Sequence, residues 1–305
     1  MREYVQGVEA MKQLKSDFVI GFIGFGLIGG SIARGLKQCI PSLTMIGYNY
    51  KKEKPNKNLL AAQADGIIDT ICTELETDFY SCDIIFLCAP VLKNIDYLSK
   101  LKGHIKPSCI LTDVGSVKGN IHEAINKLQL DSQFIGGHPM AGSEKTGYQS
   151  SSATLLRNAF YVLTPTSSTP SFMVDTMIEV IEILNAIPIM LDATKHDNVA
   201  AAISHVPHII ASELTNMVKN NDDENEMMRR LMAGGFKDTT RIASSSPEMW
   251  QNICLTNTDS IIHFLRIYKQ QIEKTLEALE NKDGEYLNQL FSSAKEYRDS
   301  IIEHK

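Results

Sequence analysis

The chain lacks a basic excess, a long apolar run and paired cysteines, and each absence excludes a class of function. Its 305 residues carry 30 lysines and arginines against 36 aspartates and glutamates, a formal net charge of −6. A nucleic-acid surface needs a positive field, so no nucleic-acid partner is expected. No apolar run reaches 18 residues, so no membrane partner is expected. The charged start, MREYVQGVEAMKQLKSD, has no signal-peptide core and predicts a cytoplasmic protein.

The six cysteines are scattered, and none forms a C-x-x-C pair. This spacing indicates neither a zinc site nor a disulfide framework, so no metal is expected and the thiols are interpreted as buried and free. The length exceeds that of a usual single core and predicts two domains.

The stretch 18–30, FVIGFIGFGLIGG, contains a G-x-G-x-x-G spacing. The apolar run before the glycines predicts a buried strand, and the helix formers after them predict a helix. This strand–turn–helix context is typical of dinucleotide binding, with the pyrophosphate at the helix N-terminus. A glycine turn without a ligand is the alternative. The residues expected to contact the cofactor here are Gly24, Gly26, Leu27, Ile28 and Gly29.

Short apolar runs alternate with helical patterns up to about residue 191. This rhythm predicts a doubly wound, mostly parallel, Rossmann-type sheet in an α/β domain spanning residues 1–191. The expected strands after the first are 43–50, 82–91, 108–113, 134–137, 159–164 and 186–191.

Two positions bear on the cofactor. An acidic residue about 20 positions past the glycines normally accepts the ribose 2′-hydroxyl, and here that position is Asn49, followed by three lysines. An amide does not repel a 2′-phosphate, so NADP stays open while NAD is slightly favoured. The turn Cys88–Ala89–Pro90 follows an expected strand and is predicted to border the cofactor.

Residues 192–305 show helical periodicity and no convincing strand. Helices are expected over 195–220, 224–233, 247–281 and 285–303, with Ser246 capping the third. A helix of some 30 residues needs a partner for its apolar stripe, so an all-α domain that forms a homodimer is predicted.

Two strand ends carry residues suited to chemistry. Ser116, in DVGSVK, is either a helix cap or a hydroxyl facing the nicotinamide. His138, in GHPMAGSE, follows a strand where ligands bind, and its ordinary pKa suits a general base. Glu144 orients the pocket or is simply solvated.

The helical half adds further candidates. His205 and His208 share a helix face, but no third ligand follows at a useful spacing, so a metal site is not expected. Arg241 has the planar fork that binds carboxylates.

Together the motifs resemble the prephenate dehydrogenase family of tyrosine biosynthesis. The matching segments are GFGLIGGS (24–31), DVGSVK (113–118), GGHPMAGSEKTG (136–147), DATKHDNVAAAISHVPHIIA (192–211) and GGFKDTTRIASSSPEMW (234–250). The resemblance implies oxidative decarboxylation of prephenate to 4-hydroxyphenylpyruvate, with hydride transfer to NAD or NADP.

The resemblance also implies roles for residues. His138 is the expected base at the substrate hydroxyl, Ser116 supports it, and Arg241 holds a substrate carboxylate. His205, His208 and Glu144 line the pocket or its entrance, and His196 and Asp238 are secondary candidates. Arogenate dehydrogenase is the nearest alternative, and a non-catalytic dinucleotide sensor is a remote one.

Overall fold

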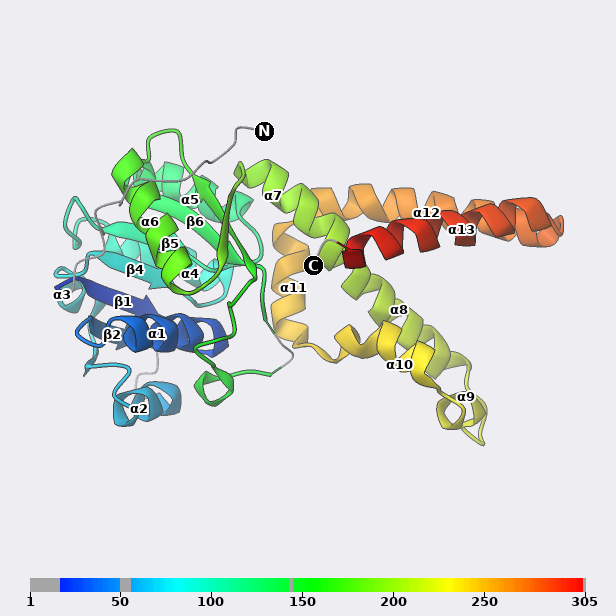
Figure 1. Cartoon of the computed structure of the whole chain (residues 1–305), viewed down its shortest axis with the longest axis horizontal. Helices are drawn as coiled ribbons and strands as arrows, with labels where there is room; N and C mark the ends of the chain where they lie inside the picture. Colours follow the sequence, from blue (N-terminus) through cyan, green and yellow to red (C-terminus); the bar gives the residue numbers. More distant parts are fainter. Residues whose placement is uncertain (1–16, 50–55, 143–144, 304–305) are drawn as a thin grey trace. The chain divides into compact units, whose positions relative to one another are not determined.

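One eight-stranded sheet organises the larger part of the chain (Figure 1). The computed structural model describes residues 17–49, 56–142 and 145–303. The strand order is β3-β2-β1-β4-β5-β6-β7-β8, and only the β6–β7 pair is antiparallel. The predicted α/β fold class is therefore confirmed. The strands are β1 Val19–Ile23, β2 Thr44–Tyr48, β3 Thr70–Ile71, β4 Ile84–Leu87, β5 Ile110–Asp113, β6 Phe134–Pro139, β7 Phe160–Pro165 and β8 Ile187–Met190.

The central strands are apolar on both faces because helices cover both sides of the sheet. On β1, Phe22 packs into one core and Ile23 into the other, as the period-2 alternation requires. The first core is closed by α1 (Leu27–Cys39), α2 (Lys57–Ala64) and α6 (Ser171–Ile183), and Figure 1 shows α1 and α6 over the same face. The second core is closed by α3 (Leu75–Asp78), α4 (Val91–Leu101) and α5 (Gly119–Leu128).

The remainder of the described chain is helical apart from its connections. The helices are α7 Ala193–Ala200, α8 Val206–Asn221, α9 Met227–Arg230, α10 Gly234–Thr240, α11 Pro247–Thr256, α12 Thr258–Glu280 and α13 Gly284–Glu303. A π-helical turn, Ala201–His205, joins α7 to α8. Asp192 caps α7 by accepting from the Lys195 amide at 2.8 Å, and the predicted Ser246 cap of α11 is confirmed.

Several predicted boundaries are wrong. The single helix expected over 247–281 ends at Thr256, because Asn257 leaves helical geometry with φ −124° and ψ 36°. The buried Asn257 side chain instead donates to the Asp197 carbonyl at 2.8 Å. The helix expected over 224–233 shrinks to the single turn of α9. Strand β6 runs two residues further than predicted, so it includes His138 and Pro139.

The chain divides into two compact units at Asn257. The first unit ends at Asn257 and contains the sheet with α1 to α11. The second, Thr258–Lys305, contains the α12–α13 hairpin. Among the residues described, no helix combines the length and the apolar character that a membrane span requires.

Candidate active site

A cavity of about 540 Å³ lies at the carboxyl ends of β1, β4, β5 and β6. Residues predicted separately at four strand ends lie together there, because turns after parallel strands converge on one sheet edge. The predicted residues that line it are Gly26, Leu27, Ile28, Cys88, Ala89, Pro90, Ser116 and His138. Helix α11 and the two residues before it form another wall, with Ser245, Ser246, Met249, Asn252, Ile253 and Thr256.

Each glycine of the fingerprint has its own steric reason. Gly24 has φ +84°, and a Cβ there would lie 2.7 Å from the Ala89 amide nitrogen. A Cβ on Gly29 would lie 3.2 Å from Cys88 Sγ, so this glycine lets α1 approach β4. A Cβ on Gly26 would meet no described heavy atom within 4 Å, so its backbone borders open space. The loop therefore presents side-chain-free main chain to the cavity at Gly26.

The N-terminus of α1 faces this cavity without a side-chain cap. The first amides of a helix have no intrahelical acceptor, and the helix dipole places partial positive charge there. A pyrophosphate fits this combination of a side-chain-free glycine and uncapped amides.

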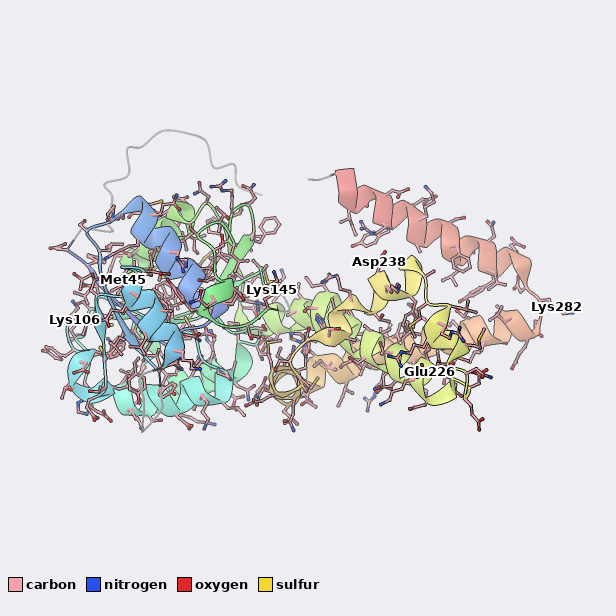
Figure 2. The ribbon with its side chains drawn as sticks, turned by 90° about the horizontal axis from the view of Figure 1, so that it is seen from below. Met45, Lys106, Lys145, Glu226, Asp238 and Lys282 are labelled. Atoms are coloured by element: carbon pink, nitrogen blue, oxygen red, sulfur yellow. The ribbon has the colours of Figure 1, made fainter. Side chains whose placement is uncertain are left out.

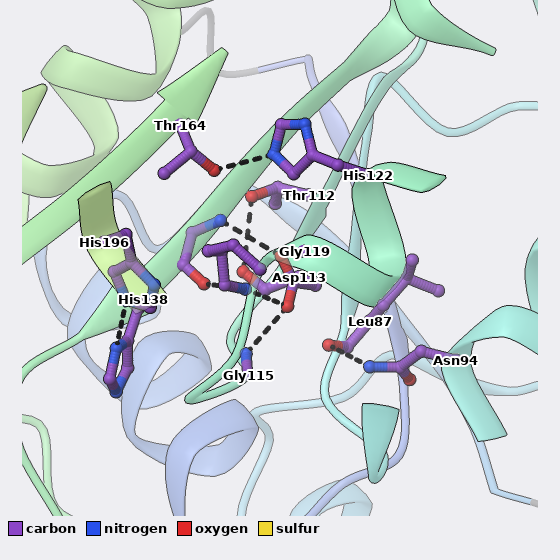
Figure 3. A network of polar contacts seen from close by, with 12 residues as sticks. Leu87, Asn94, Thr112, Asp113, Gly115, Gly119, His122, His138, Thr164 and His196 are labelled. Carbon is purple, nitrogen blue, oxygen red and sulfur yellow. Dashed lines mark hydrogen bonds and ion pairs between the residues drawn. The ribbon is translucent and has the colours of Figure 1, made fainter. Parts of the chain in front are cut away.

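A buried ion pair fixes the loop that carries Ser116 (Figure 3). Asp113 and Lys118 are both fully buried and in direct contact. Asp113 accepts from the Gly115 amide at 2.9 Å and from the Gly137 amide at 3.1 Å, while Lys118 donates to the Gly137 carbonyl at 2.8 Å. Burial lowers the pKa of Lys118, and Asp113 opposes that shift. The pair thus joins the end of β5 to the residue before His138.

His138 belongs to a chain of three hydrogen-bonded side chains, whose first link Figure 3 shows. His138 Nδ1 lies 2.8 Å from His196 Nε2, and His196 Nδ1 lies 2.8 Å from Asp197 Oδ1. The Asp197 carboxylate also accepts from the Lys118 and Gly119 amides, each at 2.7 Å. The positive end of α5 therefore stabilises the carboxylate that anchors the chain.

When both imidazoles are neutral, this order of contacts fixes the proton positions. A carboxylate accepts, so His196 Nδ1 carries a proton and its Nε2 is the acceptor. His138 Nδ1 must then donate, which leaves His138 Nε2 with a lone pair. Burial lowers the pKa of His138 well below its ordinary value, with smaller contributions from His196 and Lys118. His138 is therefore neutral near neutral pH, as a base must be.

The predicted residues of the helical half lie elsewhere. His208 and Trp250, whose rings stack with centroids 3.7 Å apart, line a second cavity of about 390 Å³, and Ser245 lines both cavities. The Arg241 charge is among the causes that lower the pKa of His208, after burial. His205 is only 1% exposed, and its Nδ1 lies 3.1 Å from Asn257 Nδ2. Burial lowers the pKa of His205 to about 4.

The structure thus does not bring His205, His208 or Arg241 to the lining of the first cavity. Asn49 is half-buried just beyond β2, and neither it nor Gly24 and Gly29 line the cavity. Asp238 is exposed on α10. Glu144 lies outside the described residues, as do the three lysines that follow Asn49. Among the described residues, no group of three or more His, Cys, Asp or Glu side chains is arranged to hold a metal.

Sequence reasoning missed three features. It took His196 only as a secondary candidate and did not single out Asp197, although the pair stands in the KHD sequence of one motif. It did not recognise the Asp113–Lys118 pair within DVGSVK. It also passed over Lys145, which lines the first cavity.

Domain models of one family match most of the chain. The model described as "Prephenate dehydrogenase, nucleotide-binding domain" matches residues 32–190. The model described as "Prephenate dehydrogenase, dimerization domain" matches residues 192–293. The chain belongs to the prephenate dehydrogenase family.

Relatives in this family agree in sequence and in fold. The prephenate dehydrogenase of Bacillus subtilis (strain 168) is 35% identical over 293 residues, which cover 95% of this chain and 77% of that protein. The structure of prephenate dehydrogenase from A. aeolicus, in complex with hydroxyphenyl propionate and NAD+, superposes with a TM-score of 0.87 at 29% identity. That match covers 95% of this chain and 100% of the other. Synechocystis arogenate dehydrogenase superposes with a TM-score of 0.80 at 30% identity, over 93% and 100% of the two chains.

Proposed function

We propose that this chain is an NAD-dependent prephenate dehydrogenase, which converts prephenate to 4-hydroxyphenylpyruvate and carbon dioxide. One observation carries the proposal above all. His138 lines the same cavity as Gly26 of the glycine fingerprint. Its hydrogen bond to His196, which is bonded in turn to Asp197, leaves the lone pair on Nε2 available as a base. A base beside a dinucleotide site is what alcohol oxidation requires.

The choice of NAD rests on the A. aeolicus relative, whose structure contains NAD+. Asn49 stands at the end of β2, where the ribose is expected, and its amide can hydrogen-bond a 2′-hydroxyl. Bound NAD+ supplies the acceptor for the hydride that leaves C4 of the substrate.

His138 takes the proton from the 4-hydroxyl of prephenate through Nε2. As the positive charge forms on its ring, His138 keeps donating from Nδ1 to His196, so the ring orientation does not change. The Asp197 carboxylate lies at the far end of this chain and stabilises the charge. The ring carboxylate then leaves as carbon dioxide, and its bonding electron pair moves through the ring to the C4 oxygen. That oxygen takes the proton back from His138, which gives the aromatic phenol and restores the base.

Ser116 lies at the rim of the same cavity, in a loop that the Asp113–Lys118 pair fixes. Its hydroxyl is proposed to hydrogen-bond the substrate oxygen that His138 deprotonates. We keep Arg241 as a carboxylate ligand, supported by its place beside His208 and by the shared wall at Ser245. His205, His208 and Glu144 remain proposed pocket residues.

The assembly proposed is a homodimer built on the helical half, from residue 192 onward. The family's dimerization model covers residues 192–293, which supports both the dimer and a domain boundary at 191/192. Within the second compact unit, exposed apolar side chains include Leu276, Leu279, Phe291 and Tyr297. A second copy would bury such side chains.

Steady-state assays with prephenate and arogenate, each with NAD and NADP, test the function. The proposal predicts the highest kcat/KM for prephenate with NAD. Preference for arogenate would instead support the activity named for the Synechocystis relative. No turnover with any of the four pairs, in protein that binds NAD, would support the sensor and overturn the proposal.

A further inference from the structure

The first cavity is nearly without formal charge. Among its described lining residues, Lys145 is the single side chain that is charged near neutral pH, since the lowered pKa keeps His138 neutral. No described aspartate or glutamate lines the cavity. A dianionic substrate entering this space therefore meets one described cation, Lys145, which is labelled in Figure 2.

The segment that carries Lys145 is fixed to the dinucleotide-binding helices. Tyr148 is fully buried, and its hydroxyl donates to Asp65 at 2.8 Å. The Arg34 guanidinium lies 4.3 Å from the centroid of the Tyr148 ring and pairs with Asp65 at 2.8 Å. Ser151 Oγ accepts from Arg34 at 3.0 Å and donates to the Tyr148 carbonyl at 2.6 Å.

This anchor has a steric counterpart on α1. A Cβ on Gly30 would lie 2.8 Å from Tyr148 Cδ2, so glycine at this position lets the segment lie against the helix. Gly147 begins the anchored turn at φ +82°, and it lines the cavity together with Thr146 and Lys145. The main chain at Lys145 is thus held at the cavity edge, between the strand of His138 and the start of α1.

We infer that Lys145 binds the side-chain carboxylate of the substrate, the one retained in the product. This inference rests on the proposed function. The cofactor pyrophosphate already has a partner of its own in the uncapped amides of α1. Of the two carboxylates of prephenate, one leaves as carbon dioxide, and a fixed cation would stabilise it in the ground state and oppose its departure. The retained carboxylate carries no such cost, so it is also the one that Arg241 would bind under the proposed function.

The test compares Lys145→Met with Lys145→Arg, which keeps the charge. Lys127→Met serves as the matched control, since Lys127 is an exposed lysine on α5 outside the cavity. The readouts are the KM for prephenate, the inhibition constant of 4-hydroxyphenylpyruvate and the dissociation constant of NAD. The product retains the side-chain carboxylate and lacks the ring carboxylate, so it identifies which of the two is bound.

For Lys145→Met we expect KM and the product inhibition constant to rise together by about 10- to 100-fold, the loss typical of a hydrogen bond to a charged group. NAD affinity, Lys145→Arg and Lys127→Met should stay within about 3-fold of the wild type. Weaker NAD binding with unchanged KM would assign the lysine to the cofactor phosphates and overturn the inference. A rise in KM without a rise in the product constant would assign it to the leaving carboxylate and equally overturn it.

Unchanged constants in Lys145→Met would show a merely solvated lysine, which also overturns the inference. Wild-type turnover of prephenate is measured first in the same series. Its absence would count against the proposed function, whereas wild-type turnover with unaltered Lys145→Met constants would count against the lysine alone.

Discussion

His138 is oriented by a second histidine, His196, which is in turn hydrogen-bonded to the Asp197 carboxylate. His196 lies between Asp197 and His138 and forms a hydrogen bond of 2.8 Å with each of them. The carboxylate itself accepts from the amides of Lys118 and Gly119, at the N-terminus of α5. Asp197 thus sets the tautomers of two rings and caps a helix that belongs to the sheet domain.

Asp197→Asn should reverse the donor and acceptor roles along this chain of hydrogen bonds. The amide offers one oxygen to three donors, and its NH₂ group favours the His196 tautomer with a lone pair on Nδ1. His196 Nε2 would then donate to His138 and move the proton of His138 onto Nε2, which abolishes the base. We expect kcat to fall by about 100-fold or more, with the NAD dissociation constant within about 3-fold.

Asp175→Asn, at an exposed position on α6, is the matched control for this variant. A kcat within about 3-fold of the wild type in Asp197→Asn, in protein of unchanged fold, would show that the tautomers do not depend on this carboxylate.

At the residue scale, the sequence predicted what lies next to a strand end. Ser116 and His138 follow apolar runs, and parallel strands bring their ends to one edge. His196 is 58 positions from His138, on a helix whose packing against the sheet no local pattern predicts. Lys118 looks like an ordinary solvated lysine until the fold encloses it with Asp113.

At the scale of an element, the glycine loop contains one glycine that the fold requires and another that we propose binding requires. Gly24 serves the turn, through its positive φ and its contact with Ala89, while Gly26 borders open space at φ −116°. The two positions are two residues apart and lie in the same loop. They therefore make a matched pair of substitutions.

Gly26→Ala should leave the melting temperature within about 2 °C, because its methyl group meets nothing in the described structure. It should weaken NAD binding by about 10-fold or more, since the methyl group would occupy the space that we propose for the pyrophosphate. Gly24→Ala should cost about 2 kcal/mol or more of stability, through strain at positive φ and the 2.7 Å approach to the Ala89 nitrogen. Thermal unfolding and NAD titration of both variants measure this. Unchanged NAD affinity in Gly26→Ala would place the pyrophosphate elsewhere.

Helix ends show where prediction from the sequence stopped. Ser246 and Asp192 cap their helices as their residue types favour. The break at Asn257 was not predicted, because the amide leaves the helix for a tertiary acceptor, the Asp197 carbonyl. That contact fastens the end of α11, a wall of the first cavity, to Asp197, the residue that anchors the His196–His138 chain.

On the scale of the whole molecule, the family's dimerization model and the exposed apolar side chains of α12 and α13 support a homodimer. The expected mass in solution is twice the chain mass of 33.9 kDa. Light scattering at micromolar concentration measures it directly. A mass of one chain under those conditions would contradict the dimer, and the exposed apolar side chains would then need another partner.

The central claim is that His138 is the base of prephenate oxidation, and His138→Asn tests it most directly. His104→Asn is the matched control, because His104 is exposed in the connection between α4 and β5. The measurement is kcat/KM for prephenate with NAD, together with the NAD dissociation constant of the same preparations. We predict that His138→Asn lowers kcat/KM by about 10²- to 10⁴-fold while NAD affinity and the control stay near wild type. Near-normal turnover in His138→Asn would contradict the account.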